Sequence, residues 1–80
     1  MNAIETIKSL ISNKIEVMNL LIKNPNYSTE AHERMRNELM GMLVCLKNIN
    51  DNGNFYCINY WDNAIEFGYY DTESKWIHIA

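Results

Sequence analysis

The chain is short of three features that would each assign it to a large class of proteins: long apolar runs, cysteines and clustered glycines. No apolar stretch in its 80 residues approaches the ~20 residues that a helix needs to cross a lipid bilayer. Its three glycines, Gly41, Gly53 and Gly68, are isolated, which excludes a glycine-rich phosphate-binding loop. Residues 1–5 lack the basic start and apolar core of a signal peptide. We therefore expect a cytoplasmic protein without a membrane partner.

The few cysteines and histidines indicate neither a disulfide scaffold nor a metal centre. Cys45 and Cys57 could form only one pair, and nothing else in the composition is typical of a secreted disulfide-rich domain. The spacing of these cysteines from His32 and His78 fits no standard zinc-binding pattern, so we expect no metal and no cofactor. His78 could form an acid–base pair with Glu66, but no nucleophile or oxyanion motif accompanies them. We therefore expect a protein that is not an enzyme.

Charge is distributed unevenly between the two halves of the chain. Residues 1–50 contain six basic and five acidic residues, whereas residues 51–80 contain five acidic residues and a single basic one, Lys75. An acidic half repels phosphate, so we expect no direct binding to nucleic acid. A basic protein surface, including one that normally holds nucleic acid, would be attracted to it. The same acidity could simply keep a small protein soluble.

Apolar residues in the first half recur every three or four positions, which is typical of amphipathic helices. One such pattern covers residues 4–22 and ends before Pro25, which has no N–H to continue a helix. A second covers about residues 29–49, and Ser28 or Thr29 can cap its free amides. Because the connection between them is short, the two helices should form an antiparallel hairpin.

The hydrophobic period changes from helical spacing to alternation at the turn formed by residues 50–54. Two alternating segments, at 55–61 and 64–70, flank Asp62-Asn63, which can form a two-residue hairpin turn. That turn pairs apolar and aromatic residues along its length: Tyr60 with Ile65, Ile58 with Phe67, and Tyr56 with Tyr69. A further turn at 71–74 leads into a third strand at 75–80.

These patterns predict an α+β fold in which an antiparallel two-helix hairpin packs on a three-stranded antiparallel β-meander. The chain should be a single domain over residues 1–80, with the helical hairpin at 1–50 and the β-meander at 51–80. A domain of this size has a small core, so burial against a second copy or a partner would add stability.

The register of the third strand stays open at this stage. A five-residue loop that includes Lys75 would place Ile77 and Ile79 on the core face, and we expect this arrangement. A four-residue loop would place Trp76 and His78 inside instead.

The second half of the second helix has more apolar surface than one neighbour can cover. Residues 39–46 are apolar nearly all round except at Gly41, so the sheet could cover one side and a second copy of the chain another. We therefore expect a homodimer with Met40, Leu43 and Val44 in its interface. Gly41 could allow close approach of another backbone, from the sheet or from the second copy, or it could be a tolerated weak spot in the helix.

The face of the sheet opposite the core carries the candidate protein-binding site. Exposed aromatic side chains are typical interface anchors, and the acidic side chains near them would suit a basic partner. Single-strand nucleic-acid binders also stack bases on aromatic side chains, but they need a basic groove that this face lacks. The candidate residues are Asn59, Trp61, Glu66, Tyr70, Asp71, Glu73, Trp76 and His78. The aromatic ones could instead pack on the helices or on a neighbouring subunit.

The segment Glu38–Lys47, which follows the capped start Ser28-Thr29-Glu30, resembles short accessory proteins of phages and prophages. This group includes anti-CRISPR proteins and other inhibitors of host defence. The resemblance covers the helical half of the chain and implies a non-enzymatic inhibitor that binds and blocks a host protein, such as a CRISPR effector. Two other functions stay open: a homodimeric structural or regulatory module, and a small-molecule-binding domain with a pocket between Trp61, Tyr70 and Trp76.

Overall fold

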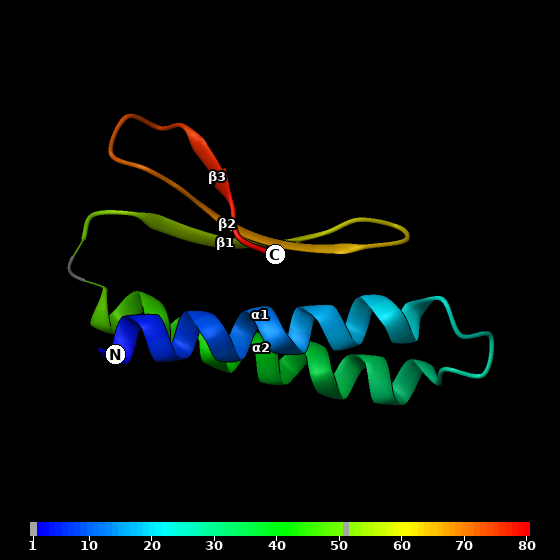
Figure 1. Ribbon diagram of the computed structural model, residues 1–80. Coiled ribbons are helices and arrows are strands. Elements are labelled where there is room, and N and C mark those ends of the chain that lie inside the picture. The colour runs from blue at the N-terminus through cyan, green and yellow to red at the C-terminus, as the bar shows by residue number, and fades with distance from the viewer. Residues whose placement is uncertain (1, 51) are drawn as a thin grey trace.

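The computed structural model describes residues 2–50 and 52–80, and it shows two layers (Figure 1). One layer is a hairpin of two helices, α1 (Ala3–Ile22) and α2 (Thr29–Ile49). The other is a three-stranded antiparallel sheet in the order β1 (Phe55–Tyr60), β2 (Ile65–Tyr70) and β3 (Trp76–His78). The expected α+β architecture is therefore confirmed.

Side-chain caps define where both helices begin. The Asn2 side chain accepts a hydrogen bond from the Glu5 amide at 2.8 Å, and Ser28 accepts one from the Ala31 amide at 3.1 Å. Ser28 is thus the cap of α2, which leaves Thr29 as its first helical residue. The predicted bounds of this helix are correct at both ends.

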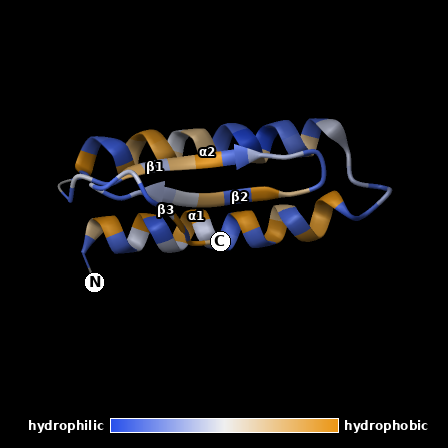
Figure 2. Cartoon of the chain, turned by 90° about the horizontal axis from the view of Figure 1, so that it is seen from above, coloured by the Kyte–Doolittle hydropathy of each residue, from blue (hydrophilic) through white to orange (hydrophobic). Residues whose placement is uncertain are grey.

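The core lies between the two layers. β1 packs on α2 and β2 packs on α1, whereas β3 pairs with β2 and contacts neither helix. Figure 2, which looks down on the sheet, shows both helices beneath it. The buried core residues are Ile4, Ile11, Ile15 and Met18 from α1, Leu39 and Leu46 from α2, and Tyr56, Ile65 and Phe67 from the sheet.

The register of the first two strands is the predicted one, with Tyr60 opposite Ile65 and Tyr56 opposite Tyr69. The Trp61 amide donates to the Ala64 carbonyl at 2.9 Å, which closes the two-residue turn. Before this hairpin, the turn that begins at Asn50 has Gly53 at φ +77°, as its turn chemistry predicts. Asp51, which belongs to the same expected turn, lies outside the described residues.

The third strand follows the five-residue loop, and Tyr69 lies opposite Ile77. Ile79 packs against the core as expected, but Ile77 is only half-buried and lies outside the core because β3 contacts neither helix. The strand is shorter than the predicted 75–80. Beyond it, the amides of Ile79 and Ala80 both donate to the Phe67 carbonyl, so one extra residue interrupts regular pairing.

Asn19 joins the two layers through a contact that the sequence analysis did not anticipate. Its side-chain amide donates to the Ile65 carbonyl at 2.9 Å and accepts from the Ile65 amide at 2.7 Å. The asparagine thus takes the place of a neighbouring strand at the start of β2, where β3 does not reach. This pair of hydrogen bonds fixes α1 relative to the β1–β2 turn.

Candidate functional site

The outer face of the sheet, which we define as the face opposite the helices, carries most of the candidate residues. No helix covers it in the described part of the chain (Figure 2). Because side chains alternate along a strand, the register places eight residues on this face. They are Phe55, Cys57 and Asn59 from β1, Glu66, Gly68 and Tyr70 from β2, and Trp76 and His78 from β3.

Glu66 is the polar centre of the outer face. Its carboxylate lies 2.9 Å from His78 Nδ1 and accepts a hydrogen bond from Asn59 Nδ2 at 3.3 Å. The His78 hydrogen bond, assisted by those of Asn59 and Trp61 and by the charge of His78, lowers the pKa of Glu66 against the opposing effect of desolvation. The structure thus brings three predicted binding residues together. A lowered pKa keeps the Glu66 carboxylate ionised at neutral pH, where it can accept hydrogen bonds from the neighbouring side chains.

Trp76 has a structural role that its sequence position did not reveal. Gly68 has no side chain, and a Cβ added there would lie 2.6 Å from Trp76 Cζ2 and would also clash with the Ile77 carbonyl oxygen. The Trp76 ring therefore covers the Gly68 backbone, and it also packs on Tyr70 at 5.1 Å between ring centroids. Trp76 and Tyr70 form one aromatic surface in which Trp76 is the more buried residue.

Three aromatic side chains in the sheet and its first turn are exposed: Tyr70 of this pair, Phe55 opposite it on β1, and Trp61 at the other end of the hairpin. The exposed fractions are 57% for Phe55, 62% for Trp61 and 42% for Tyr70. Phe55 was not among the predicted binding residues, although the alternation of β1 placed it on this face. The side chain of Lys47, on α2, makes a cation–π contact with Phe55, and its Nζ lies 4.6 Å from the ring centroid.

The two loop acids have different roles. Asp71 is half-buried, and its Oδ1 accepts hydrogen bonds from the amides of Glu73 and Lys75, both at 2.9 Å. This carboxylate holds the loop in which Ser74 takes a positive φ of 62°. Asp71 therefore builds the loop, while the exposed Glu73 side chain is available to a partner.

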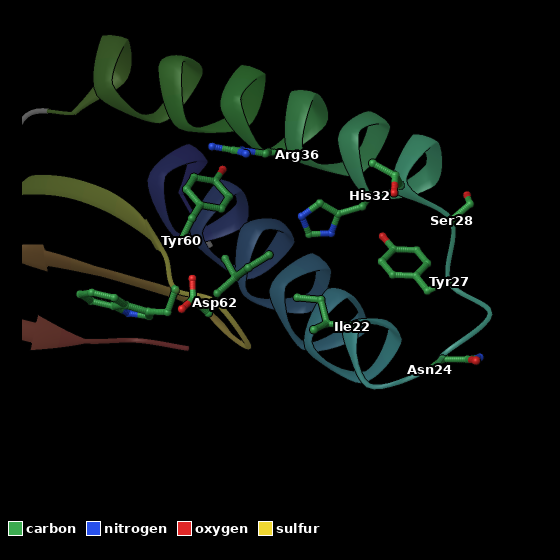
Figure 3. Close-up of a pocket in the computed structure, with 11 residues that line it drawn as sticks. Ile22, Asn24, Tyr27, Ser28, His32, Arg36, Tyr60 and Asp62 are labelled. Atoms are coloured by element: carbon green, nitrogen blue, oxygen red, sulfur yellow. The ribbon is translucent and has the colours of Figure 1, made fainter.

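A cleft of about 330 Å³ lies at one end of the molecule, where the α1–α2 connection meets the β1–β2 turn (Figure 3). Trp61 lines this cleft, but Tyr70 and Trp76 do not, so the cleft is not the expected pocket between these three residues. The cleft is lined by Ile22, Asn24, Tyr27, Ser28, Thr29, His32, Arg36, Tyr60, Trp61, Asp62 and Ile65. Sequence reasoning missed it because its two sides are separated by about thirty residues in the chain. The available signal was the spacing of His32 and Arg36, which puts both on one side of a helix.

Comparison with protein-family models, with curated proteins and with solved structures gives no match. The function therefore has to be argued from the geometry of the molecule.

The residues of the expected dimer interface do not share one environment. Met40 and Val44 are exposed, at 56% and 52%, but Leu43 is half-buried and packs against the core beneath the sheet. Nothing lies within 4 Å of the position that a Cβ on Gly41 would take. The sheet backbone therefore does not approach Gly41. Two explanations of this glycine remain: close approach of a second copy of the chain, or a tolerated loss of helix stability.

The described residues contain no metal-binding group, since no three His, Cys, Asp or Glu side chains among residues 2–50 and 52–80 lie close enough to share an ion. Cys45 and Cys57 are both free thiols, one exposed on α2 and the other half-buried on β1. In the same part of the chain, neither helix is long and apolar enough to cross a membrane.

Proposed function

We propose that the chain is a non-enzymatic protein-binding domain that uses the outer face of its sheet to hold a partner with a basic surface. The observation that carries the proposal is the uncovered sheet face on which Phe55 and Tyr70 are exposed, with the exposed Trp61 beside it in the β1–β2 turn. Aromatic side chains bury a large area for few rotatable bonds, which makes them the commonest anchors in protein interfaces.

Charge supports the choice of partner. The sheet half of the chain has a net charge of −4 from five acidic residues and one lysine. Among the acidic residues, Asp62 and Glu73 are exposed in the two loops that flank the outer face. A basic surface would be steered toward this half of the molecule, and added salt would weaken the steering.

The resemblance to phage accessory proteins indicates which class of partner the proposal names. The partner would be a host protein that normally holds nucleic acid, such as a CRISPR effector. An acidic, aromatic face bound in a basic groove would exclude nucleic-acid phosphates, because both compete for the same positive charges. Inhibition would then need no chemical step in this chain.

The test compares capture of host proteins by the wild type and by two variants. The double variant Phe55→Ser/Tyr70→Ser removes exposed aromatic area from the outer face, while Leu20→Ser removes a still more exposed apolar side chain from α1. We expect the wild type and Leu20→Ser to retain one basic partner, and the double variant to lose it. The purified partner should bind nucleic acid less well when the wild type is added.

Two results would contradict this proposal. One is equal loss of the partner with Leu20→Ser and with the double variant, which would place binding on the helices or on no particular face. The other is capture that is insensitive to salt, because it would exclude electrostatic attraction between an acidic and a basic surface.

A further inference from the structure

We infer that the cleft between the α1–α2 connection and the β1–β2 turn binds a small planar aromatic compound that carries a carboxylate or a phosphate. The inference is independent of the proposed protein-binding face, with which the cleft shares Trp61 alone among the predicted binding residues. Its basis is that aromatic walls, an apolar floor and two donor side chains, Arg36 and His32, converge on one cavity.

Shape is the first argument. Figure 3 shows Tyr60 and Asp62 on one side of the cleft, Tyr27 and His32 on the other, and Ile22 between them. Planar rings stack favourably on aromatic walls, and an apolar floor favours burial of the ligand's ring. A volume of about 330 Å³ lies at the low end of the range for small-molecule sites, which suits a ligand of one or two rings.

The walls are held in place by contacts with one another and with Met35, which lies outside the cavity. The Tyr27 hydroxyl lies 3.4 Å from Met35 Sδ, and the Tyr27 ring meets His32 edge-on at 5.7 Å between centroids. On the other side, the Arg36 guanidinium lies 4.2 Å from the Tyr60 ring centroid. Side chains held in this way lose little conformational freedom when a ligand binds.

Charge is the second argument. Arg36 makes no ion pair or side-chain hydrogen bond with any described residue, in contrast to Lys8 and Lys14, which are both paired with glutamates. The contact with the Tyr60 ring uses no N–H···O hydrogen bond, so the guanidinium can still donate to a carboxylate or phosphate. His32 lies one helical turn before Arg36 and lines the same cleft, so it can donate to the same anion.

The Asp62 carboxylate selects among such anions. It lines the cleft and is exposed to solvent. A ligand whose ring carries an N–H would donate to Asp62 while its anionic group contacts Arg36. A plain dianion without a ring would gain neither this hydrogen bond nor the aromatic walls.

The test uses four probes: indole-3-carboxylate, phenyl phosphate, neutral indole and inorganic phosphate. Titrations are followed by the indole N–H signals of Trp61 and Trp76 in nitrogen-15 NMR spectra. We expect the two aromatic anions to shift the signal of Trp61, which lines the cleft, and to leave that of Trp76 unchanged. The comparison between the two aromatic anions shows whether a carboxylate or a phosphate is preferred.

A matched pair of variants locates the anion. Arg36→Gln should weaken binding of the preferred anion by about tenfold or more, and Arg36→Lys should weaken it less, because lysine keeps the charge but loses the bidentate geometry. Arg34→Gln is the control, since Arg34 is exposed on the same helix and does not line the cleft. Thermal melting of each variant checks that the fold is retained.

The inference is overturned if neither aromatic anion shifts the Trp61 signal, if neutral indole or inorganic phosphate binds as tightly as they do, or if Arg34→Gln weakens binding as much as Arg36→Gln. Phe55→Ser/Tyr70→Ser should leave the titrations unchanged, because neither residue lines the cleft. Failure here and failure of the protein-binding proposal are therefore separate results.

Discussion

Alanine in place of Gly41 should stabilise the protein by about 1 kcal/mol, which is the difference between the two residues in the interior of a helix. Gly41 lies in the middle of α2 and is exposed. Nothing lies within 4 Å of the position where the new Cβ would be, so the gain in helix propensity is not offset by a clash. In a domain of this size, that free energy raises the melting temperature by about 4–8 °C.

The other two glycines provide controls of opposite sign. Gly68→Ala would bring a methyl group against the Trp76 ring and the Ile77 carbonyl oxygen, so it should destabilise the fold by about 1–3 kcal/mol. Gly53→Ala would place alanine at φ +77°, which should cost about 1–2 kcal/mol. Gly41→Ala should therefore have the highest free energy of unfolding and the wild type the next highest, while Gly68→Ala and Gly53→Ala should be the least stable.

Urea unfolding followed by far-ultraviolet circular dichroism measures all four free energies at one temperature. A neutral or destabilising Gly41→Ala would refute the reasoning, because it would mean that a group absent from the single chain occupies the space beside α2. Sedimentation of the same variant identifies that group. A wild-type dimer that dissociates on Gly41→Ala would show that a second copy approaches the helix at this glycine.

Three further predictions concern Asn19, Glu66 and the expected dimer interface. Asn19→Ala should lower the free energy of unfolding by about 1–3 kcal/mol in urea melts, because the Ile65 amide and carbonyl lose their partner; no loss would mean that water replaces the asparagine. The pKa of Glu66 is lowered from 4.5, so its ionised form stabilises the fold at neutral pH and this contribution is lost as the pH falls below 4.5. Urea melts at several pH values should show a smaller loss over that range for Glu66→Gln, and equal losses would exclude the effect. If the chain is a homodimer through Met40 and Val44, Val44→Glu should sediment as a folded monomer, whereas a wild-type monomer at high micromolar concentration would rule out the dimer.

The helices and the first hairpin could be predicted because local signals decide them. Ser28 can cap only a helix that starts after it, and Pro25 ends the one before. The register of β1 and β2 could be predicted because a slip of one residue would move Tyr56 and Ile58 to the other face of the sheet. In each case the deciding residues are neighbours in sequence or in one strand pair.

The third strand and the cleft depend on contacts that cross the chain. Either loop length gave the third strand an apolar face, and local spacing could not choose between Ile77 and Trp76. In the structure, the Asp71 carboxylate fixes the loop and the Trp76 ring covers Gly68. Asn19 looks like an ordinary polar position of a helix, and its role depends on where β3 ends. The roles of Asp71, Trp76 and Asn19 depend on contacts between segments that are distant in the sequence, so they can be identified only from the folded structure.

The two open faces of the molecule are not equivalent as binding surfaces, although both expose apolar residues. On the far side of the helices, Leu10, Val17, Met35 and Met42 line a shallow groove, but Lys14 lies among them and forms an ion pair with Glu38.

A partner that covered this helical groove would have to desolvate the ion pair, which costs free energy unless the partner supplies new hydrogen bonds. The outer sheet face has its hydrogen-bonded pair, Glu66 and His78, at one side of the aromatic surface of Tyr70 and Trp76. A partner can therefore bury the rings while the carboxylate keeps its donors. Because the inner faces of both layers are used for the core, this difference favours the sheet over the helices as the proposed protein-binding surface.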